Sequence, residues 1–256
     1  MQVTYATRAG DGQGNEDYVT AGPDWAVVLD GATAPAGIDS GCVHNVRWLV
    51  RQLAAALAAR MPATASPLAD LLAEAISDVR QAHGGACDLE NPDSPSSTVA
   101  MCRVTGTTLE YLSLADSAVL HARPGRPAEV FVDDRTSHLP GGRPYTYELV
   151  RSLRNQAGGF WVASTNPKAA YEAVQGACEL AGDSSVLLLT DGVTRLVELY
   201  GRTWDSLAVM AADQGPGSLI TAVRHLEDDQ PPRHGKQHDD ATAIHMTGLA
   251  MPRRSR

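Results

Sequence analysis

Two apolar segments that each end in Asp-Gly constrain the fold of this chain more than any other feature. Residues 27–31 read Val-Val-Leu-Asp-Gly, and residues 186–192 read Val-Leu-Leu-Leu-Thr-Asp-Gly. Short apolar runs of this kind are typical of buried strands. A buried lone carboxylate is costly unless a cation or a dense hydrogen-bond network lies beside it. We therefore expect Asp30 and Asp191 to meet in space, with a glycine turning the chain after each.

Two further acidic elements accompany these segments. Asn-Glu-Asp, which contains Glu16 and Asp17, precedes the strand that ends at Asp30. Asp239 and Asp240 stand just before the last apolar segment. Each motif alone is also compatible with an ordinary turn. Taken together, we interpret the four acidic elements as one metal site, because carboxylate oxygens suit hard divalent cations.

The overall charge argues against nucleic acid as a partner. The 256 residues carry a formal net charge of -9, whereas a protein that neutralises phosphates along a nucleic acid needs a basic face. No apolar run approaches the roughly 20 residues that span a bilayer, and no charged-then-apolar leader stands at the start. We expect a protein without membrane association, located in the cytoplasm.

The cysteines predict neither a disulfide framework nor structural zinc. Cys42, Cys87, Cys102 and Cys178 are widely spaced and include no C-x-x-C pair. Reduced, buried thiols in a cytosolic protein are the expected state.

The remaining pattern predicts an α+β protein with one domain over residues 1–247 and a disordered basic tail over 248–256. Predicted strands cover about 2–7, 97–104, 109–114, 119–123, 129–132 and 241–246, and predicted helices cover about 39–60, 68–83, 147–155, 204–212 and 218–227. We expect the four strands between 97 and 132 to form one antiparallel meander. Residues 133–185 otherwise look irregular, and an insertion of this length often serves as a functional lid.

The motifs, set in chain order, resemble a divergent bacterial member of the type-2C, metal-dependent serine/threonine phosphatase family. They are Asn15-Glu16-Asp17, Asp30-Gly31, Ser97-Thr98, Ala115-Asp116-Ser117, Asp191-Gly192 and Asp239-Asp240-Ala-Thr242. The resemblance covers about residues 16–246. It implies a four-layer α-β-β-α sandwich with two central antiparallel sheets.

The resemblance also implies a set of metal ligands. Asp30 would bridge two Mn²⁺ or Mg²⁺ ions, Gly31 and Glu16 would act on one of them, and Asp191 and Asp239 would hold the other. Two such cations lower the pKa of a shared water and neutralise phosphate oxygens. On this reading Asp30, Asp191 and Asp239 form the catalytic centre.

Three more acids take supporting places in the same comparison. Asp116 matches the Gly-Asp-Ser motif, which the family associates with a weaker third metal. Asp17 and Asp240 are expected to position the ligands through hydrogen bonds.

Two departures from the family pattern concern the substrate. The arginine that clamps the phosphate is replaced by Gly12, which leaves Arg8 as the nearest substitute, and the histidine after the first Asp-Gly is replaced by Ala32. His138 and Arg143, in the insertion, are further candidates for substrate contact.

These departures leave three functions open. The first is a phosphatase acting on phosphoserine or phosphothreonine in proteins. The second is a hydrolase of a small phosphate ester, and the third is a regulatory binding protein with low turnover. Acids are present at every expected metal position, which argues against the low-turnover binding protein. A site without catalytic activity would gain nothing from carboxylates that repel one another.

Overall fold

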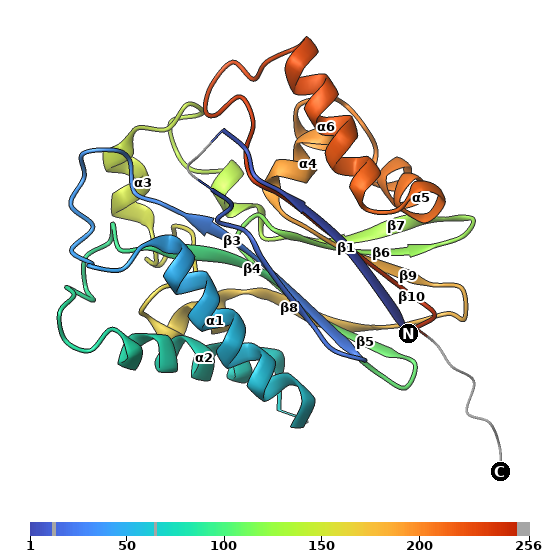
Figure 1. Ribbon diagram of the computed structural model, residues 1–256, viewed down its shortest axis with the longest axis horizontal. Coiled ribbons are helices and arrows are strands. Elements are labelled where there is room, and N and C mark those ends of the chain that lie inside the picture. Colours follow the sequence, from blue (N-terminus) through green and yellow to red (C-terminus); the bar gives the residue numbers. More distant parts are fainter. Residues whose placement is uncertain (12–13, 64–65, 250–256) are drawn as a thin grey trace.

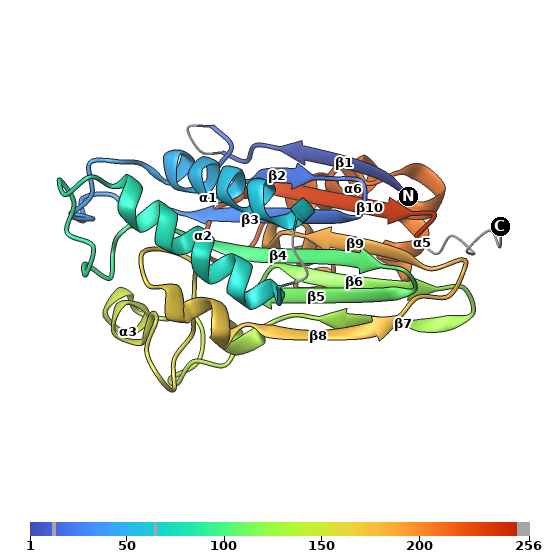
Figure 2. The same cartoon turned by 90° about the horizontal axis from the view of Figure 1, so that it is seen from below.

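Two antiparallel sheets, packed face to face, form the centre of the molecule (Figures 1 and 2). The computed structural model describes residues 1–11, 14–63 and 66–249. The first sheet has the order β1 (Gln2–Arg8), β10 (Ala241–Thr247), β9 (Ser185–Leu189), β6 (Ala118–Arg123) and β7 (Arg126–Phe131). The second has the order β2 (Tyr18–Ala21), β3 (Trp25–Ala32), β4 (Ser96–Thr105), β5 (Thr108–Leu114) and β8 (Val174–Glu179).

Helices cover the outer faces of both sheets. The second sheet is covered by α1 (Val46–Arg60) and α2 (Leu68–Ala82), and the first by α4 (Asp191–Glu198), α5 (Trp204–Gln214) and α6 (Gly217–Asp229) (Figure 1). A short helix, α3 (Tyr147–Leu153), lies beyond the end of the sheets where β3 ends (Figures 1 and 2). The predicted α-β-β-α sandwich is confirmed.

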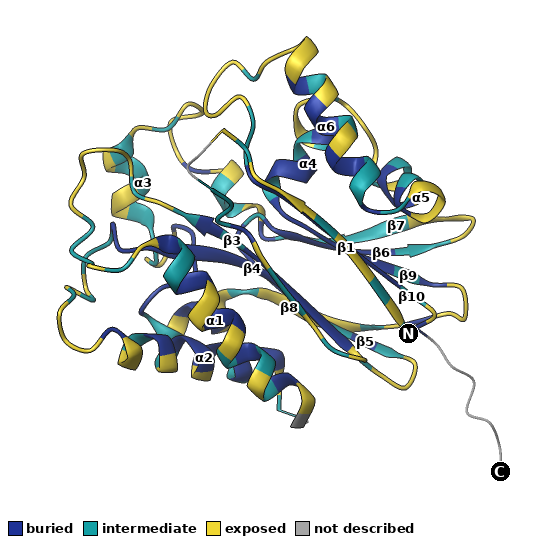
Figure 3. Ribbon diagram, in the orientation of Figure 1, coloured by how far each residue is buried: buried dark blue, intermediate teal, exposed yellow. Residues whose placement is uncertain are grey.

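Three apolar layers hold this arrangement together, and β3 takes part in two of them. Val27 and Leu29 pack against α1 and α2, whereas Ala26 and Val28 face the other sheet. Side chains alternate between the two faces of a strand. Both faces of β3 are therefore buried (Figure 3), which explains why its sequence is apolar throughout instead of alternating.

Two element predictions were wrong. Helix α1 begins at Val46, not near 39, because Asn45 caps it: its side-chain oxygen accepts a hydrogen bond from the amide of Trp48 at 2.9 Å. The expected four-strand meander is also split. Strands β4 and β5 pair in the second sheet, and β6 and β7 pair in the first, so the chain changes sheets at residues 115–117.

Three elements were not predicted. Strand β2 is only four residues long, and the exposed edge strand β8 shows no alternation of apolar and polar residues. Helix α4 starts at Asp191 itself, where a turn was expected. The insertion at 133–185 is thus less irregular than expected. It contains α3, the strand β8 of the second sheet, and the short helical turns Asp134–Ser137 and Pro167–Glu172.

The end of the described chain packs against the body. Leu249 is buried among the residues between the sheets, and residues 250–256 of the predicted tail lie outside the described residues. The single domain over 1–247 stays a prediction. No helix within the described ranges combines the length and apolar character needed to cross a membrane.

Candidate functional site

The sheet pairing gathers the sequence-predicted acids at one end of the molecule. Strand β9 runs antiparallel to β10, so the residues after β9 lie beside the residues before β10. The amide of Thr190 donates to the carbonyl of Thr242 at 3.1 Å. Asp191 and Asp239 are thereby brought to the same sheet end, although 48 positions (239 − 191) separate them in sequence.

One cavity of about 760 Å³ opens at this end. Its walls include Glu16, Asp30, Gly31, Asp116, Asp191, Asp239 and Asp240. All residues expected to hold a metal thus line a single space. The chain segment around α3 completes the wall with the apolar side chains of Leu139, Tyr145, Val150, Phe160 and Val162.

The carboxylates of this cavity are too close to one another to ionise independently. Burial and the charges of neighbouring acids, Asp191 first, raise the pKa of Asp30 well above its usual range. Burial and the charges of Asp116 and Asp239 raise the pKa of Asp191 to about 8. Burial also raises the pKa of Asp116. Opposite charge in the cavity would reverse each of these effects.

The glycines of the two Asp-Gly pairs do not turn the chain, which corrects the expectation. Gly31 lies within strand β3 and Gly192 within helix α4. A Cβ on Gly31 would lie 2.8 Å from the carbonyl oxygen of Glu16, and one on Gly192 would lie 2.0 Å from that of Asp240. Glycine is required because a neighbouring backbone approaches closely at both places.

Asp240, in the cavity wall, and Asp17, which does not line the cavity, hold together the segments that carry the site. The carboxylate of Asp240 accepts hydrogen bonds from the amides of Gly10 at 2.8 Å and Glu16 at 2.6 Å, which ties the β1–β2 loop to the start of β10. Asp17 accepts from the hydroxyl of Thr190 at 3.0 Å through Oδ2, while its buried Oδ1 has no hydrogen-bond partner. Burial raises the pKa of Asp17 to about 7.

Asp239 is held by two cationic side chains. Arg195 of α4 donates to its Oδ2 at 2.8 Å, and Lys236 lies 2.7 Å from its Oδ1. Arg195 also pairs with the fully buried Glu227 of α6, which in turn pairs with Arg224. Helices α4 and α6 therefore position Asp239 through a buried ion network that the sequence patterns did not indicate.

The structure places three other cationic side chains nearer to the acids than Arg8. Arg8 is exposed at the end of β1 and does not line the cavity, whereas Arg47, Arg154 and Lys236 do. Arg47 lies in the first turn of α1, and within the described ranges its guanidinium has no ion pair or hydrogen bond. The clamp role of Arg8 stays a prediction, and Gly12 lies outside the described residues.

The candidate substrate contacts of the insertion do not line the cavity, although the charge of Arg143 acts on the pKa of Asp116. The side chain of His138 is 71% exposed, and Arg143 stacks over the ring of Tyr145 at 5.9 Å and borders a different hollow. His238, in contrast, lines the cavity. It is held between Asp11 and Asp228, whose carboxylate oxygens lie 3.0 and 2.9 Å from its two ring nitrogens.

The donor atoms around the cavity fit hard divalent cations. Six carboxylates and the backbone at Gly31 supply only oxygen, which Mg²⁺ and Mn²⁺ prefer. Burial and the charges of neighbouring acids raise the pKa of Asp30 and of Asp191, and a divalent cation between these carboxylates would offset that repulsion.

A comparison with models of protein families gives a match over most of the chain. The family model described as Protein phosphatase 2C matches residues 6–225. The chain belongs to the protein phosphatase 2C family. A search of curated proteins finds no significant match.

Solved protein phosphatases share the fold. The Mycobacterium tuberculosis serine/threonine phosphatase PstP/Ppp is 19% identical, with 98% of this chain and 99% of that chain covered and a TM-score of 0.61. Stp1 from Staphylococcus aureus is 17% identical, with 96% of this chain and 94% of that chain covered and a TM-score of 0.63. A PstP catalytic domain in complex with two manganese ions is 17% identical, with 95% of this chain and 96% of that chain covered and a TM-score of 0.59.

One backbone feature of this protein phosphatase 2C chain stands directly beside the acids. Ala115, which precedes Asp116, has a φ of +62°. That conformation costs a non-glycine residue about 1–2 kcal/mol. It is held by the buried Asp133, whose Oδ2 accepts from the Ala115 amide at 3.2 Å. Arg135 donates to both oxygens of that carboxylate, at 2.7 and 2.6 Å, so Asp133 positions the backbone that presents Asp116.

Proposed function

We propose that this chain is a phosphatase that hydrolyses phosphoserine and phosphothreonine esters in proteins with two Mn²⁺ or Mg²⁺ ions. The observation that carries the proposal is one cavity that is lined by six carboxylates and by three cationic side chains. Family membership supports the reaction class. The manganese-bound PstP domain supports the choice of metal.

The acids of the chain divide the work of holding the ions. Asp30, Gly31 and Glu16 would face one cation, and Asp191 and Asp239 the other, with Asp30 shared. When bound, the two cations supply a water of lowered pKa and positive charge for the phosphate oxygens. Thr33 donates its hydroxyl to both oxygens of Glu16, at 2.7 and 2.9 Å, and so orients that carboxylate.

The cationic side chains would receive the phosphate. An arginine fork binds two phosphate oxygens in parallel charge-assisted hydrogen bonds. Arg47 is the strongest candidate, because its guanidinium packs over Gly14 beside Glu16 and is not engaged elsewhere in the described structure. Arg154 lines the opposite, apolar side of the cavity and donates to the carbonyl of Pro92 at 3.2 Å.

A small phosphate ester is the second candidate substrate, and two observations favour it. Ala32 offers no proton to the leaving group, and the apolar wall around Phe160 suits an aromatic or aliphatic group. Without an acid, the rate depends strongly on how readily the leaving group departs. We expect aryl phosphates to react faster than alkyl phosphates in either case, so the class must be decided among alkyl esters.

Removal of the shared ligand tests the metal chemistry. We expect no hydrolysis of p-nitrophenyl phosphate after EDTA treatment, recovery with Mn²⁺, and no recovery in Asp30→Asn, because one carboxylate serves two ions. Calorimetric titration with Mn²⁺ should show both binding events weakened in Asp30→Asn and mainly one in Asp191→Asn or Asp239→Asn. Full activity in chelated buffer, or unchanged manganese binding in Asp30→Asn, would contradict the proposal.

A substrate panel then decides between the two ester classes. Phosphoserine and phosphothreonine peptides are compared with small alkyl phosphates, all with Mn²⁺. The protein-phosphatase proposal requires a higher kcat/KM for the peptides. A higher value for the small esters would favour the second candidate, and no turnover of either alongside normal manganese binding would leave the low-turnover reading.

A further inference from the structure

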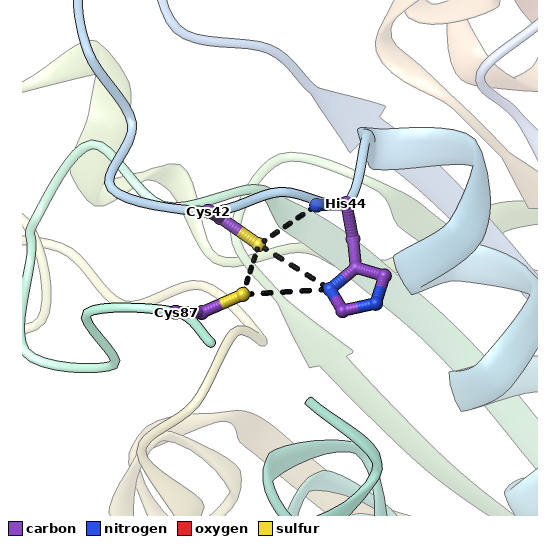
Figure 4. A group of neighbouring side chains, drawn as sticks. All are labelled: Cys42, His44 and Cys87. Atoms are coloured by element: carbon purple, nitrogen blue, oxygen red, sulfur yellow. Dashed lines mark hydrogen bonds between the residues drawn. The ribbon is translucent and has the colours of Figure 1, made fainter. Parts of the chain in front are cut away.

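A second group of metal-binding side chains lies outside the acidic cavity. Cys42, His44 and Cys87 point toward one another from two different loops (Figure 4). The two sulfur atoms are 3.3 Å apart, and Nδ1 of His44 lies 3.8 Å from Cys42 Sγ and 3.5 Å from Cys87 Sγ. All three residues are half-buried, and neither thiol is in a disulfide. The wide spacing of the cysteines in sequence did not indicate that these two meet.

We propose that Cys42, His44 and Cys87 bind one Zn²⁺ ion. Tetrahedral zinc with Zn–S bonds of about 2.3 Å and a Zn–N bond of about 2.05 Å separates its two sulfur ligands by about 3.8 Å and each sulfur from nitrogen by about 3.6 Å. The distances of 3.3, 3.8 and 3.5 Å lie within about half an ångström of that arrangement. Three protein ligands leave the fourth position to water or another small ligand.

The chemistry of the donors separates this site from the acidic cavity. Two thiolates and an imidazole select zinc, whereas carboxylate and carbonyl oxygens select magnesium or manganese. The ring of His44 is held in place by stacking on Trp48 at 3.9 Å and by an edge contact with His83 at 5.3 Å. Packing therefore orients Nδ1 toward the two sulfurs before any ion binds.

The ion would strengthen a contact between two loops that border the acidic cavity. The amide of Asp88 donates to the carbonyl of Gly41 at 2.8 Å, and the hydroxyl of Ser94 donates to the carbonyl of Ser40 at 3.3 Å. One loop leads into α1, whose second residue is the cavity-lining Arg47. The other leads into β4, whose first residue, Ser96, also lines the cavity. Zinc in this position would fix the cavity wall without touching the substrate.

A similar cluster elsewhere does not carry the same inference. His121, Glu129 and Cys178 also lie close together, but their polar atoms are already engaged. His121 contacts Ser184 at 3.0 Å through its second ring nitrogen, and Glu129 pairs with Arg123. Cys178 therefore provides a matched control for the proposed site.

Cobalt spectroscopy tests the ligands directly. The full chain is stripped of metal, reduced, and titrated with Co²⁺ in excess Mg²⁺, which occupies the oxygen ligands. We expect a thiolate-to-cobalt charge-transfer band that saturates at one ion per chain and is displaced by Zn²⁺. The band should be lost in Cys42→Ser and Cys87→Ser, and kept in Cys178→Ser and Asp30→Asn. No band in the parent, or an unchanged band in both serine variants at positions 42 and 87, would overturn the proposal.

A stability measurement provides an independent readout. In the same magnesium buffer, Zn²⁺ should raise the Tm of the parent and of Cys178→Ser but leave that of Cys87→Ser unchanged, because only the folded site binds the ion. A Cys42–Cys87 disulfide with no bound zinc, found by thiol counting and metal analysis of the chain purified without reductant, would contradict it. Neither readout uses phosphatase activity, so its outcome is separate from that of the proposed function.

Discussion

At the scale of single residues, the site depends on close backbone contacts as much as on charge. Gly31 and Gly192 follow two of the proposed ligands, and each allows a carbonyl from another segment to approach. A side chain at either place would push apart the segments that bring the carboxylates together. The glycine in each Asp-Gly pair therefore serves tertiary packing, although the same dipeptide in isolation suggests a turn.

Gly192→Ala should disrupt the site without removing a ligand. The new methyl group would lie 2.0 Å from the carbonyl oxygen of Asp240, so α4 must shift away from β10. We expect a loss of about 1–3 kcal/mol in unfolding free energy and weaker Mn²⁺ binding by calorimetry. Gly182→Ala is the matched control, because a Cβ there meets nothing within 4 Å. Equal behaviour of the two variants would refute the packing argument.

The two arginine candidates make opposite predictions for substrate binding. If Arg47 holds the phosphate, Arg47→Ala should raise KM for phosphate esters roughly ten- to hundredfold, since a charged hydrogen bond contributes about 1.5–3 kcal/mol. Manganese affinity should be unchanged. Arg8→Ala should then behave as the parent, because Arg8 is exposed outside the cavity. Steady-state kinetics with the reverse pattern would restore Arg8 as the clamp.

At the scale of elements, the position of Asp239 depends on how α4 and α6 pack on the first sheet. Arg195 contacts Asp239 and Glu227, while Arg224 contacts Glu227 and donates to the carbonyl of Asp239. Glu227 has no exposed surface. Its charge therefore compensates two guanidinium groups in a place that water does not reach.

Glu227→Gln tests this helix-to-site connection. The substitution keeps the shape but leaves the buried Arg224 without its ion-pair partner, while Arg195 keeps only Asp239. Removing one partner of a buried pair costs about 3–5 kcal/mol. Urea unfolding should show a loss of this order. The control is Glu74→Gln. The side chain of Glu74 is 63% exposed and pairs with Arg60, so its loss should lower the unfolding free energy by no more than about 1 kcal/mol. A difference smaller than the error of the two measurements would argue against the network.

At the scale of the whole molecule, the sandwich gathers negative charge at one end and leaves the other layers apolar. The helices shield the outer faces of the sheets, and the core between the sheets is largely apolar, with His121 and Ser113 among the few buried polar side chains there. Without cations, the cluster of acids opposes folding. Binding of divalent ions should therefore stabilise the protein most at those pH values at which the acids would otherwise be charged and repel one another.

The metal-free protein should lose stability as the pH rises. The pKa of Asp17 is about 7 and that of Asp191 about 8 in the folded chain, against about 3.9 in an unfolded one. Between those limits the folded state holds more protons, so its stability falls by up to about 1.4 kcal/mol per pH unit for each extra proton. Calorimetry in EDTA should show a Tm that falls from pH 5 to pH 8. In Asp191→Asn the dependence of Tm on pH should be weaker.

The exposed carboxylate of Asp183 supplies the control for this measurement. Asp183→Asn lies in a loop away from the cavity and should reproduce the slope of the parent. A Tm of the metal-free parent that stays constant or rises over this range would show that the acids are not forced together as the structure indicates.

Sequence alone determined the fold class and the identity of the acids. Buried strands such as β3 and β9 are recognisable because local hydrophobic pattern reports local burial. The acids at their ends are recognisable because burial of a carboxylate demands a reason. Chain order then made the resemblance to the phosphatase family specific.

Tertiary structure decided which residues surround those acids. Arg47 reaches the cavity because α1 packs on the second sheet. Asp17 and Thr190 are 173 positions apart, and Cys42 and Cys87 are 45 apart. Local patterns report the environment along a segment, whereas these pairings arise from packing between segments, which no single stretch of sequence encodes.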